Sequence, residues 1–523
     1  MKKIHFLPLT EDASYLDTCW NALVELDGNG VHFSHRLCHD ATDLTGNAEK
    51  AAQAREWVAR LRALDREVWV WTHEIHEMPA AFLDAEGRLR FDDADWPAYL
   101  EEKYAHFLGT VLPGITGLVF TFAETPFEVY KDRRVVSKLS PAARLTRLMS
   151  VLVDICARYG VKVAIRDFVY RVNEVASMGA AIRGLPPEVI VMSKAVPHDW
   201  EPFYPPNPLL GAVGEREQWV EYDLGYEYEG QHLLPYANLE QHHAWMCAAR
   251  AQGIRQVCLR LDRYDGHRGQ SALCTPWGRL MLEAFSAWDN DPQTPPASVA
   301  AAWETRQFPG AAQAIQQATQ SIQLMMFPKK NWMMDHCRVP RFKYAKSHLL
   351  GGNADRLADW TQDPEDVRIH EALTRMPAGF REALEEEAAL AWRGFEQANA
   401  LVQEHLPAGH ADAEIWQDGF RQLGSYLKLL TAYRDAFFRI REIEEHPQKK
   451  DLHPPAERAL QQLRETAAQE APRWVHRFFT RMSGSKLYHG VDWQTLDAPL
   501  PDAHLFKPVM QHLQSALDHA CGE

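Results

Sequence analysis

Short apolar runs alternate with amphipathic stretches over roughly the first 300 residues of the chain. The apolar runs are rich in Val, Ile, Leu and aromatic residues and give way to polar or glycine-containing turns, a pattern typical of strands that are buried on both faces. This pattern predicts eight strands, at residues 30–34, 67–73, 117–123, 162–170, 188–193, 218–224, 256–261 and 280–286.

Amphipathic helices are predicted between these strands. In the stretch SPAARLTRLMSVLVDICARYG, Ser140 is a good helix cap, Pro141 suits the first helical turn and Gly160 suits the helix end. A strand, helix, strand repeat implies parallel strands, and eight such strands close into a barrel. Residues 1–300 are therefore expected to form a (β/α)8 TIM barrel.

The remaining residues, 301–523, have a helical period almost throughout and are expected to form an all-α C-terminal domain. This part follows the turn-rich stretch AWDNDPQTPPAS and contains long segments such as FREALEEEAALAWRGFEQANALVQEHL. We interpret charge runs such as EALEEEA as solvated helix faces, and the apolar stripe of YLKLLTAYRDAFFRI as core or subunit interface.

Composition narrows the classes of function. The 523 residues carry a net charge of -15, which argues against a nucleic-acid partner because phosphates need a basic surface. No run of eighteen apolar residues suggests a membrane span, and the start MKKIHFLPLTED lacks the apolar core of a secretory signal, so a cytoplasmic location is expected. The eight cysteines include no CxxC pair, which favours reduced thiols over a disulfide framework.

Three acidic residues, Glu124, Asp199 and Glu227, each follow a predicted strand, at the barrel end where such enzymes keep their catalytic groups. Cleavage of a glycosidic bond needs one carboxyl group as acid and, for inversion, a second as base. A carboxyl trio at one barrel mouth therefore suggests glycoside hydrolysis. Position alone does not select this trio, because five other acids follow predicted strands or lie in them: Glu74, Asp167, Asp223, Asp262 and Glu283.

Three motifs favour the trio. The chain reads IRDFVY at 165–170, then VIVMSKAVPHDWEP, which places Lys194 five residues before Asp199, and then EYEGQ beginning at Glu227. In order and spacing, these motifs resemble those of the α-glucuronidases of glycoside hydrolase family 67. The resemblance covers most of residues 11–330, is strongest over 161–232, and leaves out the N-terminal β domain of that family.

The resemblance implies a role for each matched residue. Glu124 is expected to be the general acid, Asp199 and Glu227 to share the role of base, and a terminal α-linked uronic acid to be released from an oligosaccharide with inversion. Arg166 and Lys194 are expected to hold the carboxylate of the sugar. Further expected substrate contacts are Phe120, Tyr170, Trp200, Tyr228 and His73. The resemblance implies no cofactor, and a possible homodimer through the C-terminal helical domain.

One departure affects the substrate. The family has a lysine four residues before its acid, where this chain has Phe120. The site then either keeps a two-cation clamp for a uronate or accepts a neutral sugar that stacks on an aromatic ring. The stretch after Glu124 adds cations that can replace the missing charge: Lys131, Arg133, Arg134 and Lys138.

Two other classes of function stay open. His35, His39, His73 and His76 lie near strand ends and suggest a metal-dependent barrel hydrolase, but HEIHE is not the HExxH zinc signature, so we expect no metal and assign the histidines to sugar hydroxyls or to structure. The other class that stays open is a non-catalytic carbohydrate-binding protein, whose carboxylates only recognise hydroxyl groups.

Overall fold

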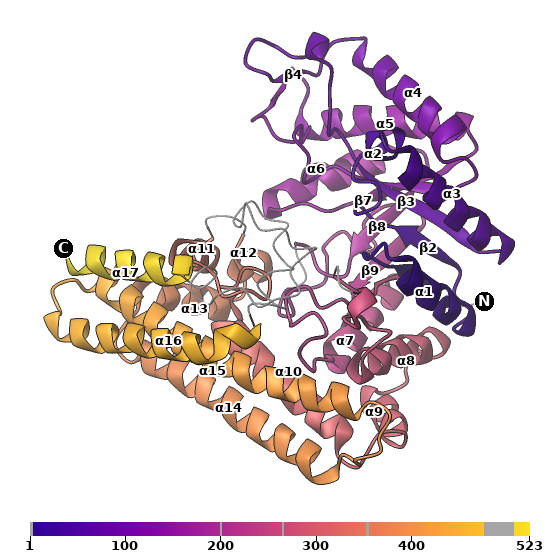
Figure 1. Ribbon diagram of the computed structural model, residues 1–523. Helices are drawn as coiled ribbons and strands as arrows, with labels where there is room; N and C mark the ends of the chain where they lie inside the picture. The colour runs from indigo at the N-terminus through magenta and orange to yellow at the C-terminus, as the bar shows by residue number, and fades with distance from the viewer. Residues whose placement is uncertain (1–3, 199–200, 264–265, 352–354, 475–506, 523) are drawn as a thin grey trace.

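The first part of the chain is a closed barrel of eight parallel strands in the order β1-β10-β9-β8-β7-β5-β3-β2 (Figure 1). The computed structural model describes residues 4–198, 201–263, 266–351, 355–474 and 507–522. The predicted TIM barrel with a following helical region is confirmed. The barrel strands are β1 (Ile4–Leu7), β2 (Gly30–Phe33), β3 (Glu67–His73), β5 (Gly117–Thr121), β7 (Lys162–Arg166), β8 (Ile190–Lys194), β9 (Gln218–Asp223) and β10 (Gln256–Arg260).

Helices cover the outside of the barrel. They are α1 (Ala13–Glu25), α2 (Ala41–Thr45), α3 (Ala48–Ala63), α4 (Trp96–His106), α5 (Pro141–Arg158), α6 (Val172–Arg183), α7 (Leu239–Ala251) and α8 (Pro276–Asn290). A small parallel pair, β4 (Leu89–Arg90) and β6 (Val135–Val136), lies outside the barrel. Between β8 and β9 the described residues contain no helix.

Seven of the eight predicted strands are confirmed, and one is wrong. Residues 280–286 lie inside α8, whose Thr275 side chain accepts a hydrogen bond from the Gly278 amide as the N-cap. A short apolar run in a buried helix has the same appearance as a buried strand, which explains the error. The true remaining strand is β1, only four residues long, which pairs with both β10 and β2 and so closes the barrel.

Asp262 stabilises this closure of the barrel through hydrogen bonds. Its carboxylate, completely buried just beyond β10, accepts hydrogen bonds from the Leu9 amide at 2.7 Å and the Thr10 amide at 2.9 Å, and another from the Thr10 hydroxyl. Burial raises the pKa of Asp262 to about 6, against the lowering effect of these donors. The short first strand is thus held at its carboxyl end by a side chain as well as by its backbone ladder.

Large aromatic side chains fill the barrel. Trp69, Trp71 and Trp219 lie in an interior cluster, separate from the main hydrophobic core, together with Leu7, Val119, Ala164, Ile190, Met192 and Cys258. The ring of Trp69 fits because Gly117 lies opposite it: a Cβ at Gly117 would come within 2.1 Å of that ring. Because side chains alternate along a strand, this inner set decides which residues point into the barrel mouth.

The rest of the chain is helical and packs beside the barrel (Figure 1). Its helices are α9 (Pro296–Glu304), α10 (Ala311–Met326), α11 (Phe342–Leu349), α12 (Leu357–Thr361), α13 (Pro364–Arg375), α14 (Phe380–His405), α15 (Ala413–Glu445), α16 (His453–Trp474) and α17 (Lys507–Cys521). The domain boundary predicted at residue 300 falls within α9 and stays a prediction. In the part of the chain that the structure describes, no helix combines the length and the apolar character that a membrane crossing requires.

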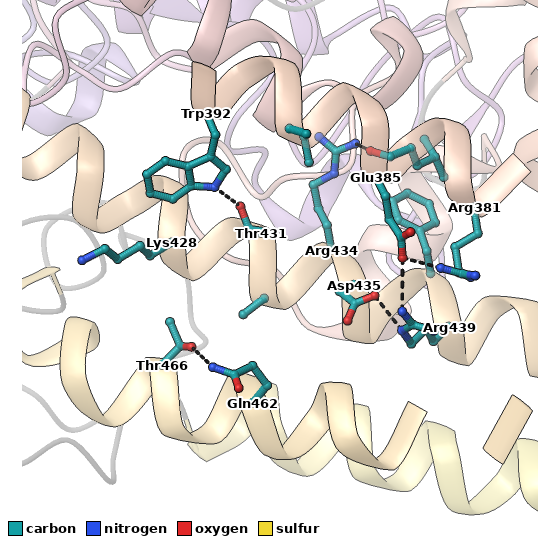
Figure 2. Close-up of a pocket in the computed structure, with 15 residues that line it drawn as sticks. Arg381, Glu385, Trp392, Lys428, Thr431, Arg434, Asp435, Arg439, Gln462 and Thr466 are labelled. Carbon is teal, nitrogen blue, oxygen red and sulfur yellow. Dashed lines mark hydrogen bonds and ion pairs between the residues drawn. The ribbon is translucent and has the colours of Figure 1, made fainter. Parts of the chain in front are cut away.

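A cavity of about 550 Å³ lies between α14, α15 and α16 (Figure 2). Leu384, Trp392 and Phe438 line it, and the Trp392 indole donates to the Thr431 hydroxyl at 2.9 Å. Its polar rim is made of ion pairs such as that between Arg439 and Asp435 at 2.6 Å. These helices therefore separate along part of their length rather than packing at uniform density.

The barrel closure gives a stability prediction. Asp262→Ala leaves two buried amides without acceptors, so the free energy of unfolding should fall by about 2–4 kcal/mol. Chemical denaturation monitored by tryptophan fluorescence measures this change. The control is Asp154→Ala, an exposed position on α5, which should change stability by no more than about 0.5 kcal/mol. Equal stability of the two variants would contradict the proposed closure.

Candidate active site

The carboxyl ends of the strands bring most of the predicted site residues to one mouth. Arg166 and Lys194 are the last residues of β7 and β8, and His73 is the last residue of β3. Glu124 follows β5 and Glu227 follows β9, so β7 and β8 lie between the strands that carry the two acids. Asp199 and Trp200 lie outside the described residues.

Glu124 points from a strained turn into an open part of the mouth. Its backbone has a φ of 60°, a left-handed conformation that is uncommon for a residue other than glycine and that often marks functional sites. The side chain is 52% exposed, and its Oε2 lies 3.9 Å from Nε2 of His73, which is buried. The carboxyl group of Glu124 is thus accessible to a ligand while one side of it faces an imidazole.

Glu227, unlike Glu124, is shielded from solvent. Its buried carboxylate contacts the guanidinium groups of Arg263 and, at 2.8 Å, Arg260, and lies 3.1 Å from Nε2 of His336. Burial raises the pKa of Glu227, but Arg263, His336 and Arg260 together outweigh burial and lower it below the ordinary glutamate value. Glu227 is therefore an ionised group at neutral pH.

His336 was not predicted from the sequence. It lies before α11 in the helical region, stacks on Tyr228 with 5.3 Å between ring centroids, and places Nδ1 3.1 Å from the Asp335 carboxylate. Burial lowers the pKa of His336, but hydrogen bonds to Asp335 and Glu227 raise it above 6.5 overall. The helical region thus supplies to the barrel mouth an imidazole whose charged form is favoured by its two acidic neighbours. No motif or periodic pattern surrounds this histidine, so nothing in the sequence marks it.

Arg166 is already paired within the barrel. Its Nε lies 2.8 Å from Glu221 Oε2 and its Nη2 lies 3.3 Å from Oε1, and both side chains are buried. The guanidinium also stacks over Trp71, with 4.8 Å to the ring centroid. Its partner is Glu221, a residue that sequence analysis did not single out. Part of the fork that was expected to bind a sugar carboxylate is therefore occupied.

Lys194 lies at the end of β8, the strand next to β7. Its ammonium donates to the backbone carbonyl of His198 at 2.8 Å and lies 4.0 Å from the centroid of the Phe168 ring. Tyr170 is half-buried on the loop that follows β7. The Lys131 ammonium lies 4.7 Å from the centroid of its ring. A cation from the stretch after Glu124 therefore does reach the β7 loop.

Phe120 requires a correction. The residue is completely buried in the main hydrophobic core, 5.5 Å from the Tyr104 ring between centroids, and not in the cluster inside the barrel. Val119 and Thr121 alternate with it, so Phe120 faces the surrounding helices. The expected contact between Phe120 and substrate is wrong. Both faces of a barrel strand are apolar, and the sequence pattern therefore does not reveal which face points inward.

Four histidines gather beside Glu124. The rings of His39 and His73 stack with centroids 4.2 Å apart, His76 lies 4.8 Å from His39, and His35 lies 5.8 Å from His73. Burial lowers the pKa of His39 to about 4, assisted by His73 and His76. Among the described residues, no group of three or more His, Cys, Asp or Glu side chains has a geometry that could hold a metal ion.

The competing acids have structural partners. Glu74 lies 2.8 Å from the Lys103 ammonium, Asp167 accepts from the Ser193 hydroxyl at 2.6 Å, and Asp262 closes the barrel. Asp223 accepts from the Glu227 amide at 2.8 Å. Glu283 is on α8, paired with an arginine at the surface. Each of these five acids thus has a contact within the fold, and Glu124 and Glu227 are the members of the predicted trio that the structure describes.

Comparisons with known proteins support the fold. No protein-family model and no curated protein matches the sequence. A glycoside hydrolase family 138 enzyme targeting pectin rhamnogalacturonan II aligns with 90% of this chain, with a TM-score of 0.54 and 10% identity, and this chain spans 62% of that enzyme. The alignment with an O-GlcNAc hydrolase variant from Thermobaculum terrenum covers 99% of this chain and 94% of that hydrolase, with a TM-score of 0.43 and 12% identity. The first of these alignments shows that the barrel fold of this chain is similar to the fold of a glycoside hydrolase.

The ionic contact between Glu227 and His336 gives a prediction that needs no substrate. Glu227→Gln removes the negative charge that favours the imidazolium, so the pKa of His336 should fall. Titration of the histidine resonances by NMR measures the change, with His336→Gln used to assign the signal. Glu283→Gln, a change at a surface ion pair on α8, should leave the pKa of His336 as it is. An unchanged pKa in Glu227→Gln would show that the contact is absent in solution.

Proposed function

We propose that the chain is an inverting, exo-acting α-glycoside hydrolase that releases a terminal uronic acid or a related sugar from an oligosaccharide. The observation that carries this proposal is the contrast between two carboxyl groups at one barrel mouth. Glu124 is half exposed beside His73, whereas Glu227 is buried and held by Arg260, Arg263 and His336. Carboxyl groups in contrasting environments are how glycosidases divide acid and base roles.

Glu124 is suited to be the general acid. In this role it donates its proton to the glycosidic oxygen as the bond to the anomeric carbon breaks, and a water attacks that carbon from the opposite face. The accessible side chain can reach a departing group, and the buried imidazole of His73 offers a contact that limits its orientation.

Glu227 is suited to a different role from the one that the family resemblance implies. A carboxylate whose pKa is lowered keeps its charge but is a weak base. We therefore assign to Asp199 the removal of the proton from the attacking water, and to Glu227 the placement of Arg260 and Arg263 at the mouth. A crystal structure with bound sugar should then place Asp199 and Glu124 on opposite faces of the ring, with the carboxyl groups roughly 6.5–9.5 Å apart.

The identity of the sugar depends on the cations between the two acids. Lys194 at the end of β8 favours an anionic sugar, whereas Lys131 near Tyr170 already pairs with Glu128 at 2.9 Å. The pairing of Arg166 with Glu221 favours the alternative, an α-glycosidase for a neutral sugar, because a paired guanidinium has fewer donors for a uronate. The reaction class is the same in both cases.

The role of Glu124 can be tested with two substrates. Glu124→Gln should lower kcat for aldotriouronic acid by roughly 10²–10⁴-fold, because the departing sugar needs a proton. The same variant should still hydrolyse α-D-glucuronosyl fluoride, because fluoride leaves without one. Glu188→Gln is a matched control, an exposed glutamate before β8 at the opposite end of the barrel. Full activity of Glu124→Gln on aldotriouronic acid would contradict the proposal. Sugar binding without any turnover by the wild-type protein would favour a carbohydrate-binding protein.

The role of Lys194 can be tested through selectivity. Lys194→Met should reduce kcat/KM for aldouronic acids by about 10- to 100-fold, the usual contribution of a charged hydrogen bond, with little change for neutral α-linked oligosaccharides. Lys162→Met is the control, because Lys162 is an exposed lysine at the other end of the neighbouring strand. If the wild-type protein cleaves only the neutral substrates, the neutral-sugar alternative is correct.

A further inference from the structure

Three buried charged groups lie behind the histidines of the mouth. The ammonium of Lys103, on α4, contacts the carboxylate of Asp40 and lies 2.8 Å from that of Glu74, which also accepts from the Tyr104 hydroxyl. The side chain of Lys103 is 4% exposed and those of Asp40 and Glu74 are fully buried. Such an arrangement costs desolvation energy, and its benefit is commonly a defined geometry rather than stability.

The two acids of this cluster are the chain neighbours of the two stacked histidines. Asp40 follows His39 at the start of α2, and Glu74 follows His73 at the end of β3. Lys103 thus joins the two loops that carry the rings. The backbones are joined as well, because the His73 amide donates to the His39 carbonyl at 2.8 Å.

The same loops approach the strand that carries the proposed acid. The Glu74 amide donates to the Thr121 carbonyl at 2.9 Å, three residues before Glu124. His73 Nε2 then lies 3.9 Å from Glu124 Oε2. The positions of His73 and of Glu124 therefore both depend on how the β2 and β3 loops meet.

The His73 ring relies on stacking for its orientation. Within the described residues, Nδ1 of His73 is buried and has no hydrogen-bond partner. The ring is fixed instead by its face-to-face contact with His39, 18° from parallel. Without the cation between Asp40 and Glu74, two like charges would face each other in a buried site and push the two loops apart.

We propose that Lys103 is a positioning residue, which holds the His39 and His73 loops together and thereby orients the carboxyl group of Glu124 in the mouth. This inference rests on the proposed role of Glu124. Lys103 does not itself reach the mouth, and its effect on catalysis passes through the two stacked rings.

The first test measures dependence on the leaving group. Lys103→Met should lower kcat for aldotriouronic acid on the order of 10²-fold, the effect of misplacing a catalytic group, with KM nearly unchanged. Hydrolysis of α-D-glucuronosyl fluoride should be nearly unaffected, because it needs no acid. Lys103→Arg, which keeps the charge, should recover part of the activity. In the Glu124→Gln background, Lys103→Met should have no further effect.

A matched control separates positioning from loss of stability. Arg434→Met also breaks a buried ion pair, with Glu387 at 2.9 Å, but in the helical region. It should lower the melting temperature as Lys103→Met does and leave the ratio of the two activities unchanged. Equal losses on both substrates in Lys103→Met would overturn the positioning role. Should Lys103→Met fail to fold, Asp40→Asn keeps the helix cap and should show the same pattern with a smaller amplitude.

The second test needs no activity. In Lys103→Met the His39 and His73 rings should separate, which removes the ring-current shift of the His73 imidazole signal in NMR spectra. Retained stacking would overturn the inference even if Glu124 is the acid. Conversely, loss of stacking combined with full activity of Glu124→Gln would support the architecture and contradict the proposed function.

Discussion

Arg260 joins the interior of the barrel to its mouth. At the end of β10 its guanidinium lies 2.8 Å from Glu227 in the loop above and 3.5 Å from Glu221 on the neighbouring strand. Glu221 in turn pairs with Arg166 on β7. Because these charges are buried, the loss of any one of them would leave its partner as an uncompensated buried charge. The position of the Glu227 carboxylate is therefore fixed by residues from three strands.

The helical region completes this network. His336 adds a third cationic neighbour to Glu227, and the carbonyl of the next residue, Cys337, accepts from the Tyr426 hydroxyl on the long helix α15. The Cys337 thiol also lies 3.1 Å from the Glu227 carbonyl. The barrel alone supplies the strands and most of the charges, but the environment that lowers the pKa of Glu227 needs a loop from the second part of the chain.

Local patterns predicted the barrel because its strands are continuous apolar runs separated by capped helices. They failed at two elements. The apolar stripe of α8 has the same pattern as a buried strand and was predicted as one, and β1, which is four residues long and followed by Pro8, was not predicted. Strand position and motif spacing predicted that Glu124, Arg166, Lys194 and Glu227 lie at the carboxyl ends of strands, where the structure has them, while their roles stay predictions. These patterns did not predict the outward face of Phe120, the pairing of Arg166 with Glu221, or His336, because these depend on register and on contacts between residues far apart in the sequence.

The two acids of the mouth are held by different physical means, and this difference fits different tasks. Glu227 contacts two permanently charged arginines and is shielded from solvent, and its lowered pKa keeps it ionised at neutral pH. Glu124 is on a strained turn with half of its side chain open, and its described neighbour is an imidazole positioned by other imidazoles. A group that must give up a proton and regain it in each cycle needs contact with solvent. A group that only holds neighbouring charges in place does not need this contact, so the asymmetry of the mouth supports the proposed role of Glu124 as the proton donor.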